Sequence, residues 1–333
     1  MMEKIAVLGA GSWGTTLSQV LSDSGAPVTL WAREEEVRES IAKRRVNETF
    51  LPGIVLSEKI TPEAGIRAAV EGADFIVSVI PSHGVRAVFS EAGPFIRKDA
   101  IIVSATKGIE EGSMLTPSGI LNEALKGCGH KAIAVLSGPS FANEVSRRLP
   151  AAVCAASTSI EAARAVQQAF STNYFRVYAN TDVIGVELGG ALKNVIAIAA
   201  GISDGLALGH NARAALITRG LAEMGRLGAA LGALPATFAG LSGLGDLVLT
   251  CTGPLSRNYT VGVSVGKGAS IDEVTGSMRM VAEGVKTCRG ASDLARRHNV
   301  DMPITEAVFS VLYKGVSPMK AVMGLMGREL KDE

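Results

Sequence analysis

Three glycines near the N-terminus have the spacing that binds a nucleotide pyrophosphate. Gly9, Gly11 and Gly14 form a G-x-G-x-x-G pattern directly after the apolar run 5–8. In this pattern the first glycine allows a tight turn, the second lets the backbone approach the pyrophosphate, and the third lets a helix pack close to the strand. Residues 15–24 are expected to form that helix, with its N-terminal N–H groups facing the phosphates. The pattern predicts a dinucleotide site, and the plainer alternative is a glycine-rich βα turn without a ligand.

A lysine occurs inside a second informative stretch, residues 183–200, which is apolar almost all round. A helix of that composition is normally buried, and Lys193 stands within it next to Asn194. Burial disfavours the charged form, so an unpaired Lys193 would have a lowered pKa and would be suited to proton transfer. The alternative is a lysine at the helix edge whose ammonium reaches water.

Three polar stretches add donors that a substrate could use. ATKG at 105–108 places Lys107 directly after an expected strand, and SGPSFA at 137–142 is a compact turn with hydroxyl and N–H groups. GPLSRN at 253–258 offers hydroxyl, guanidinium and amide donors, which suit a phosphate or an oxyanion. Each stretch alone is also explained as a charge at the rim or a helix cap. Together with the glycine pattern they indicate a substrate site.

Strands and helices alternate through the first 180 residues, which implies a mostly parallel, doubly wound α/β sheet of the Rossmann type. From Thr181 onward almost everything is expected to be helical, with Asp182, Asn211 and Ser317 as helix caps. We therefore expect a dinucleotide-binding domain over 1–180 and an all-helical substrate domain over 181–333, with the ligand in the crevice between them. Beyond the first strand and helix, the expected strands are 28–31, 75–80, 101–104, 133–136, 152–155 and 175–178, and the expected helices are 34–44, 85–89, 117–126 and 160–170.

The composition of the chain excludes several classes of binding partner. The 33 basic and 32 acidic residues give a net charge of +1, which argues against nucleic acid or an anionic membrane as the main partner. No uninterrupted apolar run reaches the ~18 residues typical of a membrane span, and the N-terminus does not have the pattern of a signal peptide. The cysteines are far apart in the sequence, so we expect reduced thiols, a cytoplasmic protein and no metal site. They are Cys128, Cys154, Cys251 and Cys288.

The residue after the second expected strand bears on the choice of nucleotide. An acidic residue near this point takes the ribose hydroxyls of NAD in many such folds. Here Arg33 follows the strand, and its planar donor fork can neutralise the 2′-phosphate of NADP. The alternative is a solvated arginine that pairs with the glutamates at 34–36. We expect NADP or NAD as cofactor, with NADPH favoured.

Six sequence blocks, in order, resemble bacterial NAD(P)-dependent sn-glycerol-3-phosphate dehydrogenases. The blocks are GAGSWGTTL, ATKGIE, SGPSFANEV, LGGALKNVIAIAAG, LSGLGDLVLTC and SRN. They extend from the first strand to about Glu283, and no block is matched beyond it. The resemblance implies an oxidoreductase that reversibly reduces dihydroxyacetone phosphate to sn-glycerol 3-phosphate, and it implies a supply of this product for phospholipid synthesis.

The resemblance also assigns roles to individual residues. Lys193 would be the proton acceptor and donor, with Lys107 and Asp246 as further catalytic residues. No metal is expected, because the lysines supply the positive charge. The cofactor contacts would be Gly9, Gly11, Ser12, Trp13, Gly14, Arg33, Lys107, Ala142, Arg257, Val281 and Glu283. The substrate contacts would be Lys107, Gly138, Ser140, Lys193, Asp246, Ser256, Arg257 and Asn258.

Two other functions fit parts of the pattern. A 3-hydroxyacid dehydrogenase or an enzyme like ketopantoate reductase also joins a Rossmann domain to a helical one, but its substrate carries a carboxylate, whereas SRN favours a phosphate. A redox-sensing regulator would bind a dinucleotide without turnover, but the sequence shows no basic DNA-reading helix. A homodimer through the helical domain is expected, because two-fold dimers are the commonest assembly.

Overall fold

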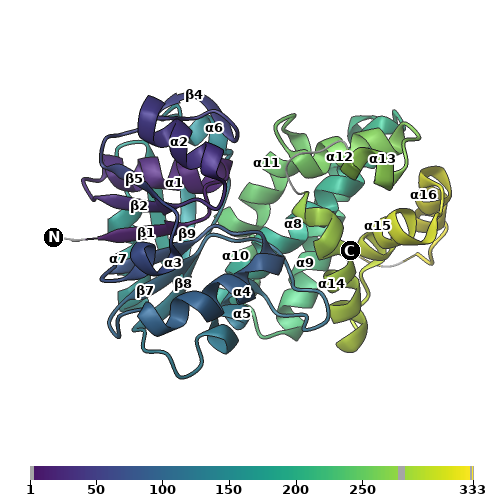
Figure 1. The fold of residues 1–333 in the computed structure, drawn as a ribbon. Helices are drawn as coiled ribbons and strands as arrows, with labels where there is room; N and C mark the ends of the chain where they lie inside the picture. The colour runs from purple at the N-terminus through teal and green to yellow at the C-terminus, as the bar shows by residue number, and fades with distance from the viewer. Residues whose placement is uncertain (1–3, 277–281, 331, 333) are drawn as a thin grey trace. The chain divides into compact units, whose positions relative to one another are not determined.

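The computed structural model describes residues 4–276, 282–330 and 332, and these form two compact units (Figure 1). Unit 1 comprises Met1–Lys107 and Leu115–Val186, and unit 2 comprises Gly108–Met114 and Glu187–Glu333. The expected domain boundary lies just after the last strand of unit 1, and the long helix α8 (Val183–Gly205) continues from unit 1 into unit 2.

Unit 1 is built on an eight-stranded sheet with the order β10-β9-β8-β7-β6-β1-β2-β5. Strands β8 and β9 run antiparallel, and the other neighbouring pairs are parallel, so the prediction of a mostly parallel sheet is confirmed. The strands are β1 (Ile5–Leu8), β2 (Val28–Trp31), β5 (Ile60–Glu63), β6 (Phe75–Ser78), β7 (Ile101–Ser104), β8 (Ala132–Ser137), β9 (Ala151–Ser157) and β10 (Phe175–Asn180).

Helices cover both faces of this sheet (Figure 1). Ile5 and Val7 of β1 pack with α1, α2 and α7, whereas Ala6 and Leu8 pack with α3, α4 and α5. Alternate residues of a strand point to opposite faces, so a strand covered on both sides is apolar throughout, as β1 is. The helices are α1 (Ser12–Asp23), α2 (Glu35–Arg44), α3 (Ile66–Val70), α4 (Ser82–Ala92), α5 (Pro117–Ala124), α6 (Ala142–Val145) and α7 (Ile160–Phe170).

The sequence did not predict three short strands of unit 1. These are β5 at the sheet edge and the antiparallel pair β3 (Val46–Asn47) and β4 (Leu51–Val55). β4 contains Pro52 and Gly53, and β5 contains Pro62. Proline cannot donate to a strand ladder and is tolerated mainly at sheet edges, so these segments do not have the pattern of strands.

Among the residues that the structure describes, unit 2 contains helices and no strand, and the prediction of a helical second domain is confirmed. The part of α8 from Leu188 to Ile202 runs through its apolar core. Added Cβ atoms at Gly201 and Gly262 would lie 2.1 Å from the Tyr259 carbonyl oxygen and 2.2 Å from the Ile198 carbonyl oxygen, so α8 and α12 cross at backbone contact. The helices after α8 are α9 (Gly209–Ala230), α10 (Pro235–Phe238), α11 (Asp246–Thr252), α12 (Arg257–Gly266), α13 (Ile271–Gly276), α14 (Glu283–Arg297), α15 (Pro303–Lys314) and α16 (Pro318–Met326).

Two of the three predicted caps are confirmed. The Gly185 N–H donates to Asp182 Oδ1 at 2.9 Å, and the Lys320 N–H donates to Ser317 Oγ at 3.4 Å. The prediction for Asn211 is wrong, because α9 already begins at Gly209 and Asn211 lies inside it. By length and composition α8 could cross a membrane, but 89% of its apolar window is buried, as in the core helix of a soluble protein.

Candidate active site

The loop between β1 and α1 has the geometry that the three glycines predict. Gly9 has φ +114°, and an added Cβ there would lie 2.7 Å from the Val79 carbonyl oxygen. At Gly14 a Cβ would lie 1.8 Å from the Gly9 carbonyl oxygen, so the close packing of helix on strand requires glycine. At Gly11 no atom lies within 4 Å of an added Cβ. The protein's own packing therefore does not need glycine at this position, and the open space beside the N-terminus of α1 fits the approach of a pyrophosphate.

The other cofactor candidates of unit 1 lie on several elements. The Ser12 hydroxyl donates to the Phe50 carbonyl oxygen at 2.5 Å, and the Trp13 ring lies 6.4 Å from the Phe175 ring, centroid to centroid. Ala142 begins α6, and its carbonyl oxygen accepts a hydrogen bond from the Thr16 hydroxyl at 3.2 Å. These contacts fix the first turn of α1 against its neighbours.

Arg33 lies at the surface just after β2. Its side chain is 81% exposed, and its guanidinium lies 3.1 Å from Glu34 Oε1. An ion pair this exposed contributes little stability. The same guanidinium can exchange Glu34 for a stronger anion such as a phosphate, so the role of Arg33 in nucleotide choice stays a prediction.

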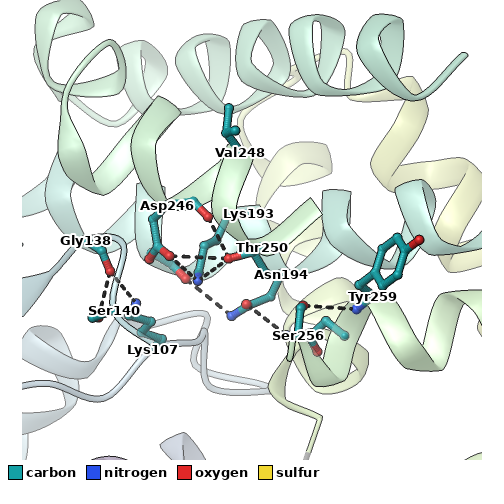
Figure 2. A network of polar contacts seen from close by, with 12 residues as sticks. Lys107, Gly138, Ser140, Lys193, Asn194, Asp246, Val248, Thr250, Ser256 and Tyr259 are labelled. Carbon is teal, nitrogen blue, oxygen red and sulfur yellow. Dashed lines mark hydrogen bonds and ion pairs between the residues drawn. The ribbon is translucent and has the colours of Figure 1, made fainter. Parts of the chain in front are cut away.

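The ends of β7 and β8 bring a second group of predicted residues together, also within unit 1. Lys107 Nζ lies 3.5 Å from the Gly138 carbonyl oxygen, and the Ser140 hydroxyl donates to the same oxygen at 2.9 Å (Figure 2). Gly138 has φ +151°, and a Cβ there would lie 2.8 Å from Val153 Cα. The turn thus requires glycine, and it places an ammonium and a hydroxyl side by side at the carboxyl edge of the sheet.

In unit 2, Lys193 forms a buried ion pair. Its Nζ lies 2.6 Å from Asp246 Oδ1 and donates to Thr250 Oγ1 at 2.7 Å (Figure 2). Lys193 is 7% exposed and Asp246 is 1% exposed. The Thr250 hydroxyl in turn donates to the Asp246 backbone carbonyl oxygen at 2.6 Å. The interpretation of a lysine at the helix edge that reaches water is therefore wrong, because the ammonium is buried and paired with Asp246. Its role in proton transfer stays a prediction.

Thr250 is the member of this cluster that the sequence reasoning missed. It follows Asp246 by four residues on α11, and residues with this spacing lie on the same face of a helix. This spacing could have predicted Thr250, because a residue four positions after Asp246 on the same helix lies next to it.

The SRN residues lie at the start of α12. Ser256 Oγ accepts a hydrogen bond from the Tyr259 N–H at 3.2 Å and so caps the helix (Figure 2). The side-chain amide of Asn258 donates to Asn194 Oδ1 at 2.9 Å, and its oxygen accepts from the Gly284 N–H at 3.0 Å. These bonds join α12 to α8 and α14, and they hold the helix N-terminus, where backbone N–H groups favour an anion.

Arg257 and Glu283 begin α12 and α14. Desolvation by the surrounding protein lowers the pKa of the Arg257 guanidinium, and the charge of Glu283 opposes this shift. Arginine remains protonated at neutral pH, so Arg257 brings a positive charge to the start of α12. Val281, the remaining predicted cofactor contact, lies outside the described residues.

Comparison with known proteins decides the family. A model of the N-terminal part of NAD-dependent glycerol-3-phosphate dehydrogenase matches residues 4–163, and a model of the C-terminal part of the same enzyme matches residues 182–323. The chain belongs to the NAD-dependent glycerol-3-phosphate dehydrogenase family. The members of this family are oxidoreductases that use NAD or NADP.

Individual relatives agree with this assignment. The chain is 56% identical over 333 residues to the glycerol-3-phosphate dehydrogenase (NAD(P)+) of Citrifermentans bemidjiense, and the match covers 100% of this chain and 99% of that protein. It is 55% identical, with the same coverage, to the enzyme of Geobacter sulfurreducens. The solved glycerol-3-phosphate dehydrogenase of Coxiella burnetii superposes with a TM-score of 0.93 at 41% identity, covering 98% of this chain and 99% of that one. The similarity therefore continues past Glu283, where the sequence blocks ended.

Proposed function

We propose that this chain reversibly reduces dihydroxyacetone phosphate to sn-glycerol 3-phosphate, with Lys193 as general acid and base. Family membership supports the reaction and the use of NAD or NADP. The observation that supports the role of Lys193 is its buried contact with Asp246 and Thr250. The dinucleotide, when bound, would supply the hydride, and we assign delivery of the proton to Lys193.

Asp246 and Thr250 orient the proton donor. With Nζ held at 2.6 Å and 2.7 Å from two fixed oxygens, the ammonium has a defined position. In reduction Lys193 gives a proton to the carbonyl oxygen as the alcohol forms, and in oxidation it takes the proton back. A buried positive charge also stabilises the negative charge that develops on this oxygen, and we assign a share of that stabilisation to Lys107.

Separate groups recognise the substrate phosphate and the carbon chain. Ser256, Arg257 and Asn258 supply a hydroxyl, a guanidinium and an amide at the start of α12, which suits a phosphate dianion. Lys107, Gly138 and Ser140 lie together at the ends of β7 and β8, and we assign them to the substrate near the nicotinamide.

The dinucleotide would lie with its pyrophosphate at the start of α1. Gly9 and Gly14 shape this loop, and Gly11 leaves the space that the pyrophosphate needs. Arg33 would take the 2′-phosphate of NADPH, which makes NADPH the favoured reduced cofactor. We assign the remaining cofactor contacts to the residues that the family resemblance implies, namely Ser12, Trp13, Lys107, Ala142, Arg257, Val281 and Glu283.

We further propose that the chain works in the cytoplasm as a homodimer and supplies glycerol 3-phosphate for phospholipid synthesis. Exposed methionines on α16 support contact between copies through the helical unit. In the single chain Met323 is 65% exposed and Met326 is 79% exposed. A second copy that packs against α16 would cover these apolar side chains. Sedimentation equilibrium would give the mass, and a monomer at micromolar concentration would contradict the dimer.

The reaction is tested by following the nicotinamide absorbance with NADPH or NADH and a panel of ketones. We expect rapid oxidation of the cofactor with dihydroxyacetone phosphate and little with 2-keto and 3-keto acids. Preferred turnover of a keto acid would contradict the substrate assignment, and dinucleotide binding without turnover of any ketone would favour the regulator.

A further inference from the structure

Asn47 is a fully buried polar residue that contacts the dinucleotide loop from another part of the chain. Its side-chain amide nitrogen donates to the Ala10 carbonyl oxygen at 2.8 Å and to Thr15 Oγ1 at 2.8 Å. The Thr15 hydroxyl donates to the same Ala10 oxygen at 3.3 Å. Asn47 and Thr15 are both 0% exposed, so the three groups form a closed triangle without access to water.

The segment that carries Asn47 is held to the loop a second time. Asn47 Oδ1 accepts from the Phe50 N–H at 3.1 Å, and the Phe50 carbonyl oxygen accepts from the Ser12 hydroxyl at 2.5 Å. The two sides of the Asn47 amide therefore have different tasks. Its oxygen shapes the turn between β3 and β4, and its nitrogen holds the loop between β1 and α1.

The contact with Ala10 determines the direction of the next N–H group. A peptide bond is planar and trans, so the C=O and the N–H of one peptide point in opposite directions. Asn47 and Thr15 hold the Ala10 carbonyl oxygen toward the buried triangle. The N–H of Gly11 must then point away from the triangle, on the residue where an added Cβ would meet no atom within 4 Å.

We propose that Asn47 is a positioning residue for the dinucleotide site, which fixes the Ala10–Gly11 peptide so that the Gly11 N–H meets the pyrophosphate. The proposal rests on the proposed dinucleotide site at residues 9–14. A loop that is already ordered spends no binding free energy on ordering its backbone, so loss of the contact weakens cofactor binding and leaves the chemistry intact.

The variant Asn47→Asp separates the two sides of the amide. An aspartate keeps the acceptor for the Phe50 N–H and the shape of the side chain, but an ionised carboxylate cannot donate to Ala10 or Thr15. We expect KM for NADPH, and Kd measured by quenching of nicotinamide fluorescence, to rise about 10–100-fold. KM for dihydroxyacetone phosphate and kcat at saturating NADPH stay within about twofold of the parent values.

The pH dependence gives a second readout. A protonated carboxyl group can donate one hydrogen bond, so the ratio of the variant Kd to the parent Kd falls as the pH is lowered. A role confined to bracing the turn would lower stability without this dependence of cofactor affinity on pH.

Ser40→Ala is the matched control. The Ser40 hydroxyl donates to the Val46 carbonyl oxygen at 2.6 Å, so this variant loosens the segment next to Asn47 without touching the loop. We expect a loss of stability with no change in the Kd for NADPH. If Ser40→Ala weakens cofactor binding as much as Asn47→Asp does, the effect belongs to the segment in general and the proposal is wrong.

Thr15→Val provides a second test if Asn47→Asp does not fold. It removes the hydroxyl from the triangle and leaves the contact between Asn47 and Ala10, so we expect a rise of several-fold in the Kd for NADPH alone. Unchanged dinucleotide affinity in either folded variant overturns the proposal. Failure of the parent protein to bind any dinucleotide would instead contradict the proposed function.

Discussion

The dinucleotide loop of unit 1 and the buried cluster of Lys193, Asp246 and Thr250 in unit 2 are built by opposite means. The loop consists of backbone and glycine, and Gly9, Gly11 and Gly14 lie within a few residues of one another. The buried cluster consists of side chains, and Lys193 and Asp246 are 53 residues apart in the sequence. The loop depends on the absence of side chains at its glycines, whereas the buried cluster depends on an ion pair between two side chains.

This difference has an energetic consequence. A loop that binds through backbone N–H groups leaves no charge buried when its ligand departs. A buried ion pair carries a desolvation cost that only its partner offsets, so removal of one member leaves an uncompensated charge. We therefore expect changes in the loop to alter cofactor affinity, and changes in the buried cluster to alter turnover and stability together.

Lys193→Ala should give the largest effect. We expect kcat to fall by ~10²–10⁴-fold, because the positioned acid and base is lost. The free energy of unfolding should also fall by ~3–5 kcal/mol, because Asp246 loses its partner. Steady-state kinetics below the unfolding temperature would measure kcat, and denaturant titration would measure the free energy of unfolding. NADPH titration should show that the cofactor still binds.

Lys126→Ala removes an exposed lysine that follows α5 and serves as the control, with turnover and stability unchanged. Turnover of Lys193→Ala close to that of the parent would remove Lys193 from the mechanism and would end the contrast between the two sites.

Two glycine variants test whether Gly14 is needed for packing within the protein and Gly11 for space that a ligand occupies. Gly14→Ala places a Cβ 1.8 Å from the Gly9 carbonyl oxygen, and we expect a loss of ~1–3 kcal/mol in stability from overpacking. Gly11→Ala meets no protein atom, so its stability should change by less than about 0.5 kcal/mol. Its affinity for the dinucleotide should nevertheless fall about tenfold or more, because the methyl group occupies the space of the pyrophosphate. Equal behaviour of the two variants in thermal unfolding and NADPH titration would show that the distinction is wrong.

Glu223 tests whether every buried charge of unit 2 serves catalysis. This residue is 1% exposed and accepts hydrogen bonds from the Ile304 N–H, the Thr305 N–H and the Thr305 hydroxyl at the start of α15. We expect Glu223→Ala to lower the free energy of unfolding by ~1–3 kcal/mol, because it leaves buried donors without an acceptor, and to leave kcat unchanged. A large fall in kcat in the folded variant would contradict a purely structural role.

The pH dependence of stability gives Glu223 a second test. Burial raises the pKa of its carboxyl group above the usual value, and the three hydrogen bonds oppose the shift. A carboxyl group with a raised pKa in the folded state contributes stability below its unfolded pKa and loses it as the pH rises through the folded pKa. Glu223→Gln should therefore lose less stability than the parent protein as the pH rises from 4 toward neutrality. Denaturant titrations at pH values about one unit apart would measure this difference. Parallel pH profiles would count against the raised pKa.

Arg33→Ala should give the smallest effect, because the side chain is mostly solvated. We expect the Kd for NADPH to rise about tenfold or less and the Kd for NADH to stay the same, since only NADPH carries the 2′-phosphate. Equal changes for the two cofactors would contradict this account of nucleotide choice.

Local sequence patterns predicted most of the strands and helices. β1 is apolar throughout, and β6 and β7 are apolar up to a final serine. All three were predicted, although β6 ends at Ser78 and not at residue 80. β4 and β5 contain proline, and their pairing depends on neighbours that a local pattern does not contain. The start of α9 was misplaced, because Asn211 is of a type that favours helix caps but lies inside this helix, which begins two residues earlier at Gly209.

The sequence by itself determined the fold class, the glycine loop and the presence of a lysine in a buried helix, because each of these signals lies within a few neighbouring residues. Only the tertiary structure decided the partners: Asp246 and Thr250 for Lys193, and Ala10 for Asn47. Such contacts join residues 37 to 57 positions apart, and their distances are set by how helices and strands pack. Packing is a property of the whole core, so no single stretch of sequence contains it.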